Sequence, residues 1–394
     1  MVDIVKYNCS RMSIDENKLT KAQSDTINLI RFPMALLVVL IHTDVYYQTW
    51  QADVNLLSGE GVCFLFGYIL QFIAGIAVPT FFMISGFLFF ANFREFSCDG
   101  YKKKMKSRFK TLIVPYVLWN IVVFAAKIVG KIAQMYYIGE SWSFVTDFIS
   151  DTSWHFIWDI NRWGDVNRPW LWWTTYQTSP IDVPLWFLRD LIVVTVFSPL
   201  IYLMIKRLKI FAVLIFFVAY VMSFWVVWHG FGVAAFFYFT LGTYFAINGK
   251  NIVVFCSRYS KLIIAVVIIF FILFLTRWIS DDYKSIVKNL FFVSAVFTAF
   301  FVASRLVIYK GVKASPLLLS SCFFIYACHA AALPKSLLGF VNIVFHLIIP
   351  GDTYLERIFC YLVVPCVTVA ALVFAYWLLM KWFPRIGKVF CGGR

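Results

Sequence analysis

The stretch Arg31-Phe-Pro-Met-Ala-Leu-Leu-Val-Val-Leu-Ile-His42 places an arginine and a histidine at the two ends of an otherwise apolar segment. An α-helix turns about 100° per residue, so residues eleven positions apart return to the same face, about 16 Å from each other along the axis. Ionisable side chains inside a membrane are costly and usually face a bundle interior or a water-filled cavity. The pair Arg31 and His42 therefore predicts a functional site.

The composition around this stretch is that of a polytopic membrane protein. Of 394 residues, 62% are hydrophobic and only 14% are charged, which excludes an ordinary soluble domain. Apolar runs of about 20 residues are expected to cross a membrane as helices. We count ten such runs and predict an all-α fold, with helices near 27–48, 64–92, 111–137, 184–205, 210–228, 231–248, 261–280, 286–308, 317–340 and 358–383.

The net charge of +15 is explained by membrane topology. Lysine and arginine gather in the N-terminal tail (1–26), in segment 93–110, in alternate short turns and in the C-terminal tail (384–394), whereas the intervening loops are poor in basic residues or acidic. Cytoplasmic loops collect basic residues. The pattern therefore predicts a single transmembrane domain (27–383) with both termini in the cytoplasm, and it gives no reason to expect a nucleic-acid partner.

Cysteine and histidine usage favours neither a disulfide framework nor a metal site. The nine cysteines contain no CxxC pair, and the histidines contain no pair at i,i+4 spacing. We therefore expect no metal cofactor.

The longest predicted loop, 138–183, lies outside in this topology and holds seven of the fifteen tryptophans. One interpretation is an aromatic belt lying on the lipid headgroups. The other is a cap over an external substrate entrance, in which indole rings stack on sugars while Asp, Asn and His155 bind hydroxyls.

His42 is the strongest candidate for chemistry, because an imidazole can exchange a proton near neutral pH and can also accept an acyl group. If the first helix enters from the cytosol near Ile27, Arg31 lies near the cytosolic boundary and His42 lies deeper, toward the outer side. The structural alternatives are a histidine bonded to a neighbouring helix and an arginine that reaches the headgroups.

Five landmarks in this order resemble the membrane-bound acyltransferase family 3. They are Arg31-x10-His42, the Phe81-Phe-Met-Ile-Ser-Gly-Phe-Leu88 run, a basic segment leading into Leu112-Ile-Val-Pro-Tyr-Val-Leu-Trp119, Pro184-Leu-Trp-Phe-Leu-Arg189 and Phe324-Ile-Tyr-Ala-Cys-His329. The resemblance implies transfer of an acyl group, most often acetyl from acetyl-CoA, to a glycan or another acceptor at the bacterial cytoplasmic (inner) membrane. It also implies that His42 is the essential histidine and Arg31 its companion, with His42 acting either as general base or as acyl carrier.

The donor side departs from the family pattern. Some members have an Arg-x-x-Arg pair before the third helix. The corresponding stretch here is Arg108-Phe-Lys-Thr111, in which Arg108 and Lys110 are the basic residues. We take Arg108, Lys110, Lys104 and Ser85 as candidate acyl-CoA contacts, since a basic cytosolic segment attracts the anionic nucleotide. The alternatives are that the cluster only sets topology or binds anionic lipid, and that Ser85-Gly86 forms a packing seam between helices.

Five later residues are candidates for acceptor binding or support of the site: Trp186, Arg189, Asp190, Tyr326 and His329. Arg189 and Asp190 could equally form a structural ion pair. Tyr326 and His329 are three apart in one helix, so they lie on neighbouring faces and could bond His42 or the substrate.

Two other function classes remain open on the sequence. A transporter or exporter of a small organic acid or lipid-linked sugar would line its pathway with Arg31 and His42, and a scaffold for a polysaccharide synthase would need neither residue. The sequence identifies neither the acyl group nor the acceptor, and it leaves the oligomeric state open, a homodimer included.

Overall fold

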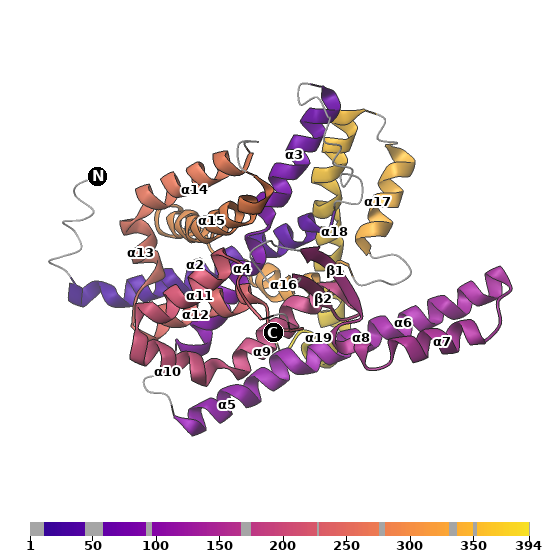
Figure 1. The fold of residues 1–394 in the computed structure, drawn as a ribbon, viewed down its shortest axis with the longest axis horizontal. Helices are drawn as coiled ribbons and strands as arrows, with labels where there is room; N and C mark the ends of the chain where they lie inside the picture. Colours follow the sequence, from indigo (N-terminus) through magenta and orange to yellow (C-terminus); the bar gives the residue numbers. More distant parts are fainter. Residues whose placement is uncertain are drawn as a thin grey trace.

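A computed structural model describes residues 12–43, 58–91, 97–166, 175–226, 228–275, 280–330, 337–349 and 353–393. Its helices are α2 (Met12–Ile41), α3 (Gly59–Ala74), α4 (Ala77–Phe90), α5 (Cys98–Arg108), a π-helical turn η1 (Phe109–Ile113), α6 (Val114–Ile138), α7 (Ser143–Thr152), α8 (His155–Trp158), a 3-10 turn η2 (Val183–Leu185), α9 (Trp186–Val196), α10 (Ser198–Leu208), α11 (Ile210–Val221), α12 (Val233–Ile247), α13 (Ile252–Arg258), α14 (Ser260–Leu275), α15 (Asp281–Lys310), α16 (Pro316–Cys328), α17 (Leu337–Ile348), α18 (Tyr354–Trp382) and α19 (Pro384–Phe390) (Figure 1). The all-α prediction is confirmed, with one exception: strands β1 (Asn161–Val166) and β2 (Thr175–Ser179) form an antiparallel hairpin within the long loop.

Each of the ten predicted segments contains a helix, but the helices differ in length and several end before the predicted boundary. Within the described ranges, five stretches are long and apolar enough to cross a membrane: Thr20–Ile41, Gly59–Phe90, Cys98–Ile138, Tyr283–Lys310 and Tyr354–Trp382. Two bent pairs, α9–α10 at 59° and α13–α14 at 75°, raise the number to seven if each pair is one span. Helices α11, α12 and α16 have 12, 15 and 13 residues, short of the roughly 20 that a straight span needs, so the count of ten remains a prediction.

The centre of the bundle is the crossing of α4 and α12. A Cβ on Gly86 would lie 2.1 Å from the Phe239 carbonyl oxygen, and one on Gly242 would lie 2.0 Å from the Met83 carbonyl oxygen. Small residues let two backbones approach closely where helices pack in a membrane. Gly86 and Gly242 therefore form a close packing contact between α4 and α12.

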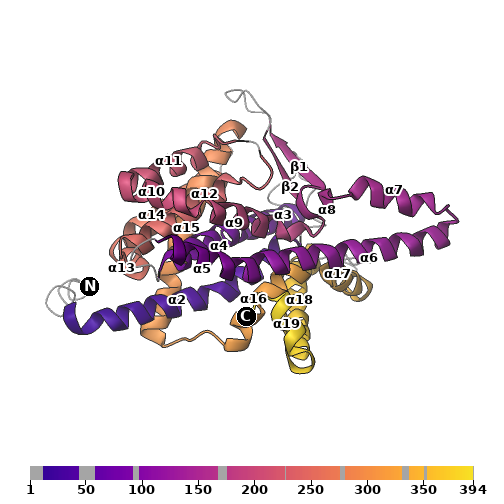
Figure 2. The ribbon, with the colours of Figure 1, turned by 90° about the horizontal axis from the view of Figure 1, so that it is seen from below.

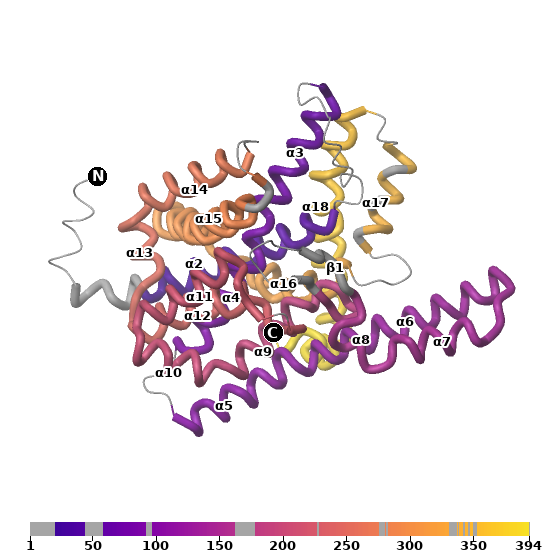
Figure 3. Tube along the Cα trace, viewed as in Figure 1, coloured from indigo at the N-terminus to yellow at the C-terminus, as the bar shows by residue number. Residues whose placement is uncertain are grey.

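Helix α2 packs along α15 and α16 and also contacts α3, α4, α13 and α18. It begins at Met12, so residues 12–26 of the predicted N-terminal tail are helical. Gln23 joins this part of the helix to α13, because its side-chain oxygen accepts a hydrogen bond from the Ile252 backbone N–H at 2.6 Å. Helix α18 runs beside α3 (Figure 3), and the Tyr361 hydroxyl donates to the Gly67 carbonyl across that contact.

The long loop is largely structured. Helix α6 ends at Gly139, whose positive φ of 75° suits a left-handed C-cap, and α7 turns back along α6, so that the two helices form an arm that projects from the bundle (Figures 1 and 2). Helix α8 and the hairpin then lie against the bundle near α9. The segment 167–174, which holds three of the loop's tryptophans, lies outside the described residues.

The C-terminal segment packs on the bundle. Helix α19 lies against α6, where the Trp119 indole N–H donates to the Phe390 carbonyl at 3.1 Å. Gly392, with a positive φ of 67°, approaches the Thr111 carbonyl of η1 so closely that a Cβ would lie 2.4 Å from it.

Candidate functional site

His42 lies directly after the last residue of α2, beside His329, which follows α16. Their ring centroids are 5.0 Å apart and their planes are inclined by 50°. Nδ1 of His329 lies 3.1 Å from the Ile325 carbonyl and 2.9 Å from the Tyr326 carbonyl, so it must carry a proton and donate it. Nε2 of His329 is then an acceptor, and it is buried with no hydrogen-bond partner among the described residues.

Arg31 lies within α2, the helix that ends one residue before His42. The guanidinium is half-buried and interacts electrostatically with Cys322 of α16. Within the described ranges it makes no hydrogen bond or ion pair. A half-buried cation with unused donors can bind a phosphate or a carboxylate.

Helix α16 thus faces both ends of the motif, because Cys322 and His329 are seven residues, or about two turns, apart. Tyr326 lies between them and is fully buried, and its hydroxyl donates to the Pro184 carbonyl. This bond ties α16 to the turn that begins α9. Trp186, at the start of α9, is half-buried against the main hydrophobic core and serves packing.

Asp182 is a buried polar residue that sequence reasoning missed. Its side chain is fully buried, and neither carboxylate oxygen has a hydrogen-bond partner among the described residues. Burial raises the pKa of Asp182 well above its usual range, while the Lys127 ammonium on α6 opposes this shift. Asp182 also interacts electrostatically with Tyr116 and Tyr326. The only signal in the sequence is that Asp182 stands two residues before Pro184, at the start of an apolar run. A count of the charges in the long loop does not distinguish Asp182 from the other acidic residues of that loop.

Arg189 and Asp190 form a buried ion pair at 3.0 Å. The guanidinium also donates to the Trp158 carbonyl at 2.6 Å and to the side-chain and backbone oxygens of Thr178 at 3.0 Å. Asp190 accepts a hydrogen bond from the Gly232 backbone. Arg189 therefore holds α8 and β2 on the bundle, and these contacts occupy the donors that an acceptor would need.

The basic segment forms a second group, and no described contact joins it to Arg31. Arg108 is half-buried with its guanidinium carbon 5.7 Å from the centre of the Phe89 ring on α4. Lys104 is half-buried, one turn earlier, and Lys110 is exposed in the π-helical turn. Ser85 is half-buried on α4, next to Gly86. A π-helical turn inside a long helix often marks a functional site.

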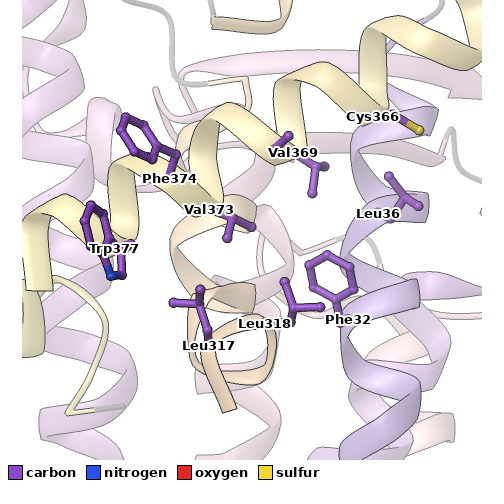
Figure 4. A pocket seen from close by; sticks show the side chains of 10 residues that line it. Phe32, Leu36, Leu317, Leu318, Cys366, Val369, Val373, Phe374 and Trp377 are labelled. Carbon is purple, nitrogen blue, oxygen red and sulfur yellow. The ribbon is translucent and has the colours of Figure 1, made fainter. Parts of the chain in front are cut away.

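An apolar groove of about 720 Å³ lies between α2, α16 and α18 (Figure 4). Phe32 and Leu36 line one wall, Leu318 faces them, and α18 supplies the rest up to Phe374 and Trp377. No charged or imidazole side chain lines the groove, so it suits a hydrocarbon chain of the surrounding lipid better than a reacting group. Within the described ranges, no three His, Cys, Asp or Glu side chains are placed to hold a metal ion.

Comparison with known proteins shows the family of the chain. The model of acyltransferase family 3, described as an acyltransferase domain, matches residues 25–380. The succinoglycan biosynthesis protein ExoH of Rhizobium meliloti (strain 1021) is 27% identical over 186 residues, which cover 47% of this chain and 44% of that protein. The chain thus matches less than half the length of that relative, and no solved structure matches it. Because the family model covers nearly the whole chain, including Arg31, His42 and His329, the protein belongs to acyltransferase family 3.

Proposed function

We propose that the protein moves an acyl group, in the simplest case acetyl, from acyl-CoA to a hydroxyl of a cell-surface or lipid-linked glycan. The observation that carries this proposal is the His42–His329 pair at the end of the helix that also bears Arg31, whose guanidinium has no hydrogen-bond or ion-pair partner among the described residues. The family supplies the acyl chemistry. The name of the relative, a succinoglycan biosynthesis protein, supports a polysaccharide acceptor.

In this proposal His42 acts as general base. It takes the proton of the acceptor hydroxyl, whose oxygen attacks the thioester carbonyl; the C–S bond breaks, and the imidazolium returns the proton to the CoA thiolate. His329 faces it with an acceptor nitrogen that can bind the N–H of a protonated His42. The alternative is that His42 accepts the acyl group first and passes it on.

The donor would arrive at the basic face of the molecule. Arg108, Lys104 and Lys110 would attract the CoA phosphates, Ser85 would line the donor's path along α4, and Arg31 would hold a phosphate or carboxylate nearer His42. The basic segments then lie in the cytoplasm, as the positive-inside rule requires, with both termini on that side of the bacterial inner membrane.

The test is release of CoA by purified protein in detergent, given acetyl-CoA and glycan acceptor. We expect His42→Ala to abolish release without changing the melting temperature. Thr43→Val is the matched control, since among the described residues the Thr43 hydroxyl bonds only the Val39 carbonyl of its own helix, and it should retain activity. Unchanged turnover in His42→Ala would remove His42 from the chemistry.

The same assay separates the transporter alternative. An exporter would bind or move its substrate with no dependence on acyl-CoA, and wild-type protein would release no CoA at any acceptor concentration.

A further inference from the structure

A second cluster of ionisable side chains lies apart from His42, where α8 meets the loop before α12. Asp159 accepts a hydrogen bond from Nδ1 of His155 at 2.7 Å on one carboxylate oxygen and from Nδ1 of His229 at 2.5 Å on the other. His155 and Asp159 come from the long loop, whereas His229 is 70 residues farther along the chain. The contact puts these two loops on the same side of the bundle, as the predicted topology requires.

The carboxylate fixes how the two rings are presented. Asp159 is only 11% exposed, whereas the side chains of His155 and His229 are 43% and 29% exposed. A carboxylate that accepts from Nδ1–H fixes the imidazole tautomer and its orientation. Nε2 of His155 makes no hydrogen bond to the described residues and belongs to a side chain that is 43% exposed, so it can bond a ligand.

The cluster stands on a rigid base. Arg189 donates to the Trp158 carbonyl, Tyr116 donates to the Ile157 carbonyl, and the Ile181 backbone N–H donates to the Phe156 carbonyl at 2.8 Å. These bonds fix α8 from the buried side.

The loop that carries His229 is fixed in the same way. Asp190 accepts from the Gly232 backbone, and Gly230, with a positive φ of 89°, lies so close to Trp158 that a Cβ would be 3.0 Å from its ring. A binding constellation is precise when its supporting contacts are already made within the protein.

Two exposed indole rings flank the histidines. Trp154 is 61% exposed and stacks on His155 with ring centroids 4.0 Å apart. Trp228, next to His229, is 71% exposed and packs edge-on against Phe231. An aromatic belt at a membrane interface accounts for exposed indoles, but it does not account for two imidazoles held by one shared carboxylate.

We propose that Trp154, His155, Asp159, Trp228 and His229 form a carbohydrate-binding site. Sugars combine flat C–H faces, which pack on indole rings, with hydroxyls that bond imidazole nitrogens in either direction. The two loops present both kinds of group on one surface. This inference rests on the proposed function in one respect, which is that the bound sugar belongs to the glycan that is acylated; the binding itself needs no acyl donor.

The test is binding of the purified protein to an array of bacterial surface oligosaccharides in the absence of acyl-CoA. We expect wild type to bind at least one oligosaccharide. The double variant His155→Ala/His229→Ala should lose about fivefold in affinity or more, as the loss of the hydrogen bond from Nε2 of His155 predicts. Trp154→Ala should weaken binding of the same oligosaccharide.

Trp142→Ala is the matched control, because Trp142 is also exposed but lies at the opposite end of α7 from Trp154. It should bind like wild type. Equal losses in Trp142→Ala and Trp154→Ala would show unspecific aromatic adsorption and would overturn the proposal, as would a double variant that binds like wild type or an array that captures nothing.

The two proposals fail in different ways. If wild type binds a sugar through this cluster but releases no CoA, the binding site stands and the acyl transfer falls. If CoA release depends on His42 and sugar binding is unaffected by the double variant, the acyl transfer stands and this site falls. Melting temperatures of both variants near that of wild type exclude a loss by unfolding.

Discussion

The replacement of His329 by asparagine separates two roles that the structure gives this residue. An asparagine amide can occupy the position of Nδ1 and donate to the carbonyls of Ile325 and Tyr326, which lie 3.1 and 2.9 Å from Nδ1 in His329. It has nothing at the position of Nε2, the buried acceptor beside His42. His329→Asn should therefore fold like wild type and lose only the support of a protonated His42.

The magnitude follows from the kind of bond that is lost. A hydrogen bond to a charged group contributes about 1.5–3 kcal/mol, and each ~1.4 kcal/mol of transition-state stabilisation is a factor of ten in rate. We expect kcat for CoA release to fall by about ten- to 150-fold, with the KM for acyl-CoA unchanged. His329→Gln is the complementary variant: it extends a polar group toward the Nε2 position but loses the carbonyl anchor, so it should keep more activity and melt at a lower temperature.

The assay is steady-state CoA release, with the melting temperature of each variant measured in the same detergent. A kcat for His329→Asn within about twofold of wild type would refute the role of Nε2. A large drop in melting temperature for His329→Asn would refute the assumption that the anchor is preserved.

Two further predictions concern packing and the donor side. Gly242→Ala should destabilise the protein by about 1–3 kcal/mol or more, because its Cβ would lie 2.0 Å from the Met83 carbonyl. The control Gly130→Ala has nothing within 4 Å of its Cβ, so it should be neutral or stabilising by up to about 1 kcal/mol. Thermal melting in detergent checks both variants, and equal melting temperatures would contradict the close approach of α4 and α12. Arg108→Met should raise the KM for acyl-CoA about tenfold at constant kcat if the half-buried guanidinium binds a donor phosphate. Lys110→Met, at an exposed position, should change this KM less than about threefold. Equal effects of the two variants would mean that the basic segment acts only through its net charge.

The helical bundle and the motif helix were predictable because both depend on strong local signals. Apolar runs of about 20 residues identify helices in a membrane protein. A separation of eleven positions between Arg31 and His42 fixes a shared face in any continuous helix. The helix lengths were not predictable in the same way. Helix α12 is as apolar as a span, but it is short and almost wholly buried against α4 and its other neighbours, and hydropathy does not distinguish a buried helix from one that faces lipid.

The candidate site was predictable in its members but not in their partners. His329 could be singled out as an imidazole in an apolar helix, yet its contact with His42 joins residues 287 positions apart, which no local pattern encodes. Arg189 was expected either to bind an acceptor or to form an ion pair, and the contacts that decide this come from Trp158 and Thr178 in the long loop. Asp182 was missed because only its three-dimensional surroundings show that its carboxylate is buried.

The placement of both site histidines at helix ends has an electrostatic consequence. His42 follows the C-terminus of α2, and His329 follows the C-terminus of α16. The carboxyl end of a helix carries a partial negative charge of about half an electron, and it stabilises a nearby cation by about 0.3–1 kcal/mol, up to ~2 kcal/mol when partly buried. Two such ends meet at this pair, so a positive charge formed on His42, whether by protonation or by acylation, is stabilised by the dipoles of two helices at once.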